Sequence, residues 1–131
     1  MDILDHIGAI SLFEELPTEH QKALASLVVD KTYKRGGLVF SEGDEGTGFF
    51  VIITGRVKIF KLSIEGKEQI IHIFGNGEPI GEAAVFAGKP FPANAEALED
   101  SRLFFFPRID FIKLIQKDPT LALNMLAVLS V

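Results

Sequence analysis

The chain has 131 residues, a formal net charge of −5 and no cysteine. A chain of this length suits a single domain, 1–131; its acidic balance repels nucleic acid, and the lack of cysteine excludes disulfides, cysteine-ligated zinc and iron–sulfur clusters. Because it has neither an apolar run of ~18 residues nor the charged start of a signal peptide, we predict a cytoplasmic protein without a membrane partner.

Residues 1–29 are predicted to form N-terminal helices. Apolar residues recur at helical spacing in ILDHIGAI near the start of the chain. After Pro17, the segment Thr18–Gln21 has the form of a capping box, which indicates the start of a second helix that runs to Val28.

Residues 30–106 are predicted to be a β-roll. Short β-branched or aromatic runs alternate there with glycine at nearly regular intervals, as in FFVIITG and RVKIFKLSIEG. Gly55 and the segment Ser63–Gly66 are interpreted as hairpin turns, and Glu99–Asp100 as a further turn. Seven or eight short strands at this spacing predict an all-β sandwich or barrel.

Residues 107–131 are predicted to return to helices. The segment RIDFIKLIQK is amphipathic, and Asp118–Pro119 supplies an N-cap and a first-turn proline for a second helix, TLALNMLAVLSV. That helix is apolar nearly all round and stops at Val131 without a C-cap signal. We therefore expect it to be the truncated start of a longer helix that is buried on two sides.

The segment GEAAVFAGKPFPANA, residues 81–95, is the main candidate binding site. A Gly-Glu pair followed by backbone amides is typical of a cradle for an anion. A purely structural interpretation is also open. Gly81 would then permit a tight approach of the backbone, and Glu82 would lie in the first turn of a short helix at AAVF.

In this order, these features resemble the N-terminal sensor domain of the CRP/FNR family of bacterial transcription regulators. The resemblance rests on the leading helix, Gly43, FFVIITGRVKIFK, Gly66, Gly81-Glu82, FPANAEALEDS and PRIDFIKLI. It implies a mainly β fold with flanking helices, a double-stranded β-helix (jelly-roll-like β-roll) of the cyclic-nucleotide-binding type. It also implies a homodimer formed through the last helix, with dimer contacts at Leu121, Met125, Val128 and Leu129. DNA would be bound only by a helix-turn-helix domain that this chain lacks.

The resemblance also defines the expected ligand pocket. In nucleotide-binding relatives the glutamate of Gly-Glu accepts a hydrogen bond from the ribose, and an arginine ten residues later pairs with the cyclic phosphate beside a serine or threonine. Here Gly81 and Glu82 match, but Pro92 and Ala93 occupy the arginine and hydroxyl positions. With Ala83 and Lys89, these residues form the predicted pocket, a non-standard phosphate site whose effector is unknown.

Two other functions remain open, and catalysis is not expected. Lys89 and backbone amides could suffice for a true cyclic-nucleotide module that binds cyclic AMP or cyclic GMP. His72 could ligate haem in a sensor of nitric oxide or redox state, as the resemblance to haem-based relatives implies. A metal-dependent barrel enzyme needs clustered histidines and a carboxylate, whereas the three histidines here are scattered, so we predict neither a metal site nor a catalytic residue.

Overall fold

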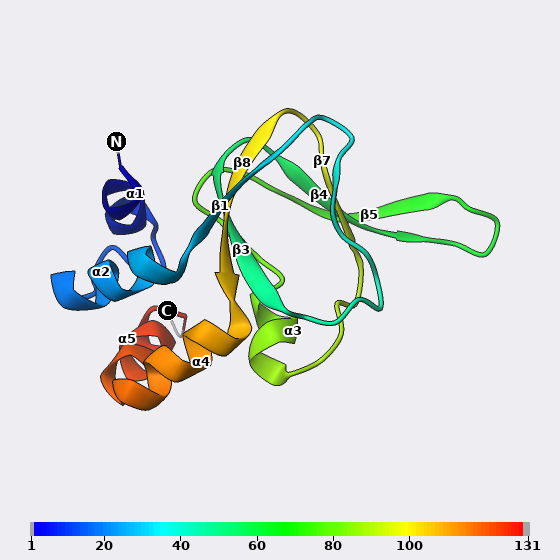
Figure 1. Ribbon diagram of the computed structural model, residues 1–131. Helices are drawn as coiled ribbons and strands as arrows, with labels where there is room; N and C mark the ends of the chain where they lie inside the picture. Colours follow the sequence, from blue (N-terminus) through cyan, green and yellow to red (C-terminus); the bar gives the residue numbers. More distant parts are fainter. Residues whose placement is uncertain (1, 130–131) are drawn as a thin grey trace.

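A β-roll makes up the fold, and the N-terminal and C-terminal helices gather on one side of it (Figure 1). The computed structural model describes the backbone of residues 2–129 and the side chains of residues 2–127. The helices are α1 (Ile3–Ala9), α2 (Thr18–Leu27), α3 (Glu82–Ala87), α4 (Arg108–Lys117) and α5 (Pro119–Leu129). The strands are β1 (Val29–Tyr33), β2 (Leu38–Phe40), β3 (Gly48–Thr54), β4 (Val57–Leu62), β5 (Glu68–Phe74), β6 (Pro79–Ile80), β7 (Asn94–Ala97) and β8 (Ser101–Pro107).

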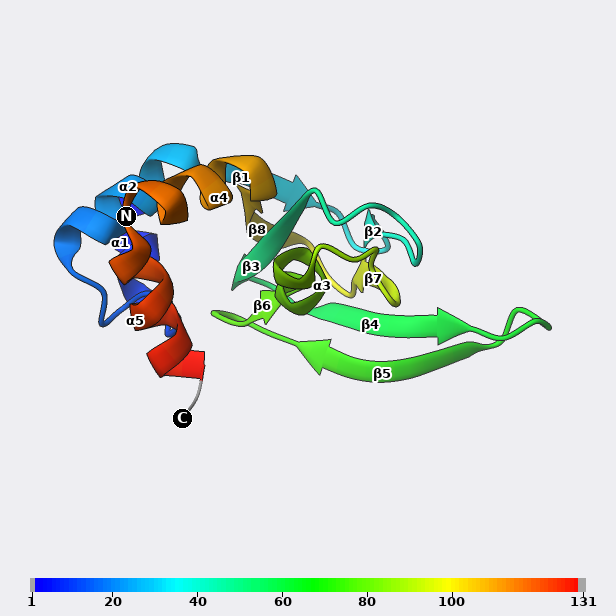
Figure 2. The ribbon, with the colours of Figure 1, turned by 90° about the horizontal axis from the view of Figure 1, so that it is seen from below.

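The strands pair in a nested way. They form two four-stranded antiparallel sheets, with the orders β1-β8-β3-β6 and β2-β7-β4-β5. The first strand therefore pairs with the last, β2 with β7, β3 with β6, and β4 with β5. The β4–β5 hairpin lies at the middle of this pattern and projects away from the helices (Figure 2). This topology confirms the predicted jelly-roll-like double-stranded β-helix.

The predicted turns are only partly correct. The turn at Ser63–Gly66 does join paired strands, since Leu62 lies opposite Glu68. The hairpin predicted at Gly55 is wrong, because β3 and β4 belong to different sheets. Gly55 has a φ of +120° and turns the chain from one sheet to the other. Two strand-like runs on either side of a glycine predict a turn, but they do not say which strands pair.

Phenylalanine side chains connect the roll to the helices. Phe49 of β3 stacks on Phe106 of β8 with ring centroids 4.9 Å apart, and Phe13, which follows α1, meets Phe106 edge-on at 5.4 Å. Phe111 of α4 approaches Phe49 from a further direction, at 5.3 Å. These aromatic contacts fix the helices against the sheet formed by β1, β8, β3 and β6.

The helix starts differ from prediction at one place and agree at another. The segment Thr18–Gln21 is not a capping box: α2 has no side-chain cap, and the Gln21 amide donates instead to the Phe13 carbonyl at 3.0 Å. At the start of α5, the Asp118 carboxylate accepts from the Thr120 backbone N–H at 3.2 Å, as predicted for an N-cap. No helix within residues 2–129 has the length and apolar character that crossing a bilayer requires.

A side-chain hydrogen bond joins the N-terminal and C-terminal helices. His20 of α2 lies 2.5 Å from the Asp118 carboxylate, measured from Nε2 to Oδ2, and only 8% of His20 is exposed. Because the carboxylate accepts, Nε2 must carry the proton. Asp118 separates α4 from α5, so this contact holds the corner between them against α2. The hydrogen bond from His20 holds the pKa of the Asp118 carboxyl below its ordinary value.

The His20–Asp118 pair should make the fold sensitive to acid. A carboxyl group whose pKa is lowered by folding stabilises the protein above its unfolded pKa, near ~3.9, and this contribution is lost as the pH falls through the folded value. We therefore expect Asp118→Asn to flatten the fall in melting temperature between about pH 5 and pH 3. The control is Asp110→Asn, at an exposed carboxylate of α4. Equal slopes for the wild-type protein and Asp118→Asn would contradict this prediction.

Candidate ligand sites

Gly81 starts the short helix that forms the predicted cradle. It follows β6 directly, has a φ of +77° and is the N-cap of α3. A Cβ at this position would lie 2.8 Å from the Phe91 ring and 3.3 Å from the Phe40 ring. Glycine is therefore required here both for the backbone conformation and for the space that the two aromatic rings occupy.

Two aromatic rings fill much of the cradle. Phe40 and Phe91 are buried and stack with centroids 3.9 Å apart and ring planes 11° apart. The cavity that remains has a volume of about 180 Å³. It is lined by Phe40, Ile59, Phe74, Pro79, Ile80, Gly81, Glu82, Ala83, Ala84, Phe91, Pro92 and Ala93. Most of these side chains are apolar.

The cradle contains an acidic side chain but no basic one. Glu82 is half-buried in its wall, and Pro92 and Ala93, which offer no side-chain hydrogen-bond donor, line the same cavity. Lys89 does not line it. That lysine lies beyond the end of α3, in a separate hollow that it shares with Glu45 and Arg108. Of the six predicted pocket residues, five thus lie together, and the single cation among them is elsewhere.

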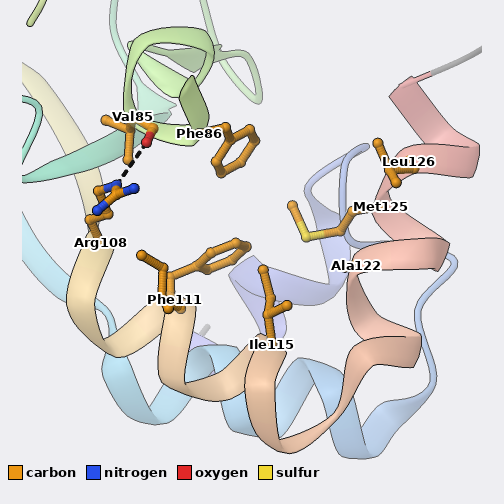
Figure 3. Close-up of a pocket in the computed structure, with 9 residues that line it drawn as sticks. Val85, Phe86, Arg108, Phe111, Ile115, Ala122, Met125 and Leu126 are labelled. Atoms are coloured by element: carbon orange, nitrogen blue, oxygen red, sulfur yellow. Dashed lines mark hydrogen bonds between the residues drawn. The ribbon is translucent and has the colours of Figure 1, made fainter. Parts of the chain in front are cut away.

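A second cavity, of about 260 Å³, lies between α3, α4 and α5 (Figure 3). Its lining residues are Val85, Phe86, Arg108, Phe111, Ile112, Ile115, Ala122, Met125 and Leu126. The sequence indicated the apolar faces of α4 and α5 but not the space between them. Three separate elements enclose this cavity, so no single sequence motif marks it.

Aromatic rings and one guanidinium shape this second cavity. Phe86 stacks on Phe111 at 5.7 Å and meets Phe49 edge-on at 5.2 Å, which fixes one wall. Arg108 lies at one end and Met125 and Leu126 at the other (Figure 3). The Arg108 Nε donates to the Val85 carbonyl at 2.9 Å, so the side chain is anchored to α3.

His72, the predicted alternative haem ligand, lies outside both cavities. His72 is exposed on β5 with its ring 4.3 Å from that of Phe74, and it lines neither cavity, whereas a haem ligand needs an apolar chamber around it.

Two of the predicted dimer residues are already covered within the chain. Leu121 and Met125 are buried, so in this conformation neither is available to a second copy, because helix α5 turns this face toward its own domain. The side chains of Val128 and Leu129 lie outside the described residues. On the described part of α5, the large apolar side chains that are exposed are Leu123 and Leu126, at 66% and 57%.

Known proteins share both the sequence and the fold of this chain. The family model described as "Cyclic nucleotide-binding domain" matches residues 30–118. The chain is 30% identical over 119 residues to the cyclic AMP receptor protein of Thermus thermophilus. The aligned region covers 91% of this chain and 55% of that protein. The chain spans about half the length of the curated transcription regulators that it matches.

Solved structures of domains from transcriptional regulators superpose over almost the whole chain. The sensor domain of the transcriptional regulator DNR from Pseudomonas aeruginosa matches with a TM-score of 0.82 at 31% identity, over 96% of this chain and 85% of that one. The N-terminal domain of a transcriptional regulator from Streptomyces coelicolor matches with a TM-score of 0.83 at 28% identity, over 96% and 88%.

Proposed function

Because the chain belongs to the cyclic nucleotide-binding domain family, we propose that it is the effector-sensing domain of a CRP/FNR-type transcription regulator and that it does not hold its effector by the family's arginine–phosphate contact. The likeness to the sensor domain of one transcriptional regulator and to the N-terminal domain of another supports the first part. One observation carries the second: the cradle at Gly81 has no basic side chain in its lining. The Phe40–Phe91 stack also occupies part of the space beside it.

Electrostatics make this cradle a poor site for a cyclic phosphate. A hydrogen bond between charged partners, such as arginine and phosphate, contributes about 1.5–3 kcal/mol, and more where water is excluded. Pro92 offers neither a side-chain donor nor a backbone N–H. Glu82 adds a negative charge to a cavity that would receive an anion, and Lys89, the one cation predicted for this pocket, lies in another hollow. The domain is thus a sensor without catalytic activity whose cradle is closed to the usual ligand.

The output of the sensor would be the position of α5. A ligand held between the roll and this helix would favour one packing of α5 over another, which is a shift between two populated states. In the full regulator, α5 would pack against its twin in a homodimer and re-aim a DNA-binding domain outside this chain. Leu123, which is 66% exposed on the described part of α5, would contribute to that contact.

Calorimetry with cyclic AMP and cyclic GMP tests the closed cradle. We expect dissociation constants above about 1 mM for both nucleotides, equivalent to less than about 4 kcal/mol of binding free energy. Micromolar binding that is lost in Glu82→Ala would contradict the proposal and favour a true cyclic-nucleotide module. The Thermus thermophilus cyclic AMP receptor protein, named for its ligand, is a suitable positive control.

A further inference from the structure

We propose that the cavity between α3, α4 and α5 binds a small carboxylic acid with an apolar body, such as a medium-chain fatty acid, and that Arg108 receives its carboxylate. This inference rests on the proposed sensor function and names the class of effector. The cavity is distinct from the Gly81 cradle, because no residue lines both. Different residues of helix α3 contribute to each.

The walls of the cavity suit an apolar ligand body. Arg108 is the one charged residue in its lining; the others are aliphatic, aromatic or methionine side chains. Val85, Phe111 and Met125 are buried, whereas Phe86 and Leu126 are exposed at 42% and 57% and so lie toward solvent. A volume of about 260 Å³ is too small for a large planar cofactor and suits a short chain or a single ring.

Arg108 has donors to spare. A guanidinium carries five N–H groups, and one of them, on Nε, is used by the Val85 carbonyl at 2.9 Å. Within residues 2–127 the structure gives the four Nη donors neither an acceptor nor a carboxylate in ion-pair distance. Glu45 and Lys89, one acidic and one basic, line the neighbouring hollow together with Arg108. A half-buried cation of this kind, already held in place, matches the planar fork of a carboxylate.

The location connects such a ligand to the output helix. Val85 and Phe86 belong to α3, Phe111 to α4, and Met125 and Leu126 to α5, so one bound molecule would contact all three helices (Figure 3). Its apolar body would replace solvent between α3 and α5. An acid in this cavity would therefore favour the packing of α5 against the roll.

Titration calorimetry of the 131-residue chain with octanoate and with octanamide tests the charge recognition. The two probes have the same apolar body, but octanamide has no charge. We expect octanoate to bind at least about tenfold more tightly, the factor that a charge-assisted hydrogen bond supplies. Arg108→Gln should remove this preference, whereas Lys89→Gln, which removes a nearby charge outside the cavity, should keep it.

Two further measurements do not depend on the folding of the arginine variant. In the wild-type chain, octanoate should bind more tightly than hexanoate by about threefold to fourfold per methylene. Ala122→Phe, which fills the cavity and leaves Arg108 intact, should abolish binding of both acids.

Several results would overturn the inference. These are no binding of octanoate, equal binding of octanoate and octanamide, or unchanged binding in Ala122→Phe. Any of them, together with a negative result for cyclic AMP, would remove this ligand class and leave the sensor proposal standing. Micromolar cyclic AMP binding that depends on Glu82 would instead contradict the closed cradle.

Discussion

Replacing Gly55 by alanine is expected to lower the free energy of unfolding by roughly 4 kcal/mol, from backbone strain and overpacking together. The φ of +120° at Gly55 is a conformation that residues with a side chain rarely adopt. A Cβ there would collide with the Ser101 hydroxyl and would lie 2.5 Å from the Ser101 Cβ and 2.8 Å from its Cα. Because part of this clash is with the backbone of β8, no rotation of a side chain relieves it.

Gly66→Ala is the matched control for Gly55→Ala. Gly66 also has a positive φ, +81°, but nothing lies within 4 Å of the position that a Cβ would take. We expect this variant to lose only about 1–2 kcal/mol, the conformational cost alone. Urea unfolding followed by far-ultraviolet circular dichroism measures both. Similar losses in the two variants would show that the close approach of Ser101 does not matter.

Phe91→Ala is expected to destabilise the fold by about 3–5 kcal/mol. The Phe91 ring is buried, stacks on Phe40 and packs against Gly81, so its removal leaves a hole that the rigid roll cannot close. Phe86→Ala is the control, since 42% of Phe86 is exposed. We expect it to cost less than half as much in the same urea experiment, and equal losses would contradict the role of the stack.

The same variant separates two reasons for a closed cradle. Phe91→Ala enlarges the cavity beside Glu82 but supplies no cation to it. If the missing charge prevents cyclic nucleotide binding, calorimetry should still give a dissociation constant above about 1 mM for cyclic AMP. Micromolar binding by Phe91→Ala would mean that the aromatic rings, rather than the lost arginine, exclude the nucleotide.

The fold could be predicted from the sequence in outline but not in its pairing. Glycine-bounded apolar runs marked most of the strands, and the order of motifs identified the roll. The error at Gly55 has a physical cause: whether a turn joins two strands of one sheet or carries the chain across to the other depends on Ser101 and Asn76, which are distant in sequence. The residues next to Gly55 in the sequence therefore cannot predict which strands pair.

The candidate sites, too, could be predicted from the sequence only in part. Gly81, Glu82, Pro92 and Ala93 were placed together because a motif spans them. Lys89 was assigned to this group by its proximity in sequence, but the end of α3 directs it into another hollow. The cavity at Arg108 could not be predicted, because in the sequence this arginine is only the first residue of an amphipathic helix.

The nested pairing of β1 with β8 has a consequence for biosynthesis. On the ribosome the chain emerges from its N-terminus, so β1 is made early, while its partner ends only at Pro107. Until then β1 has no neighbour, because in the finished sheet it lies at the edge beside β8 alone. The β4–β5 hairpin, in contrast, can form as soon as residue 74 is free. Closure of the roll therefore cannot be completed before residue 107 has left the ribosome, whereas its central hairpin can already be in place.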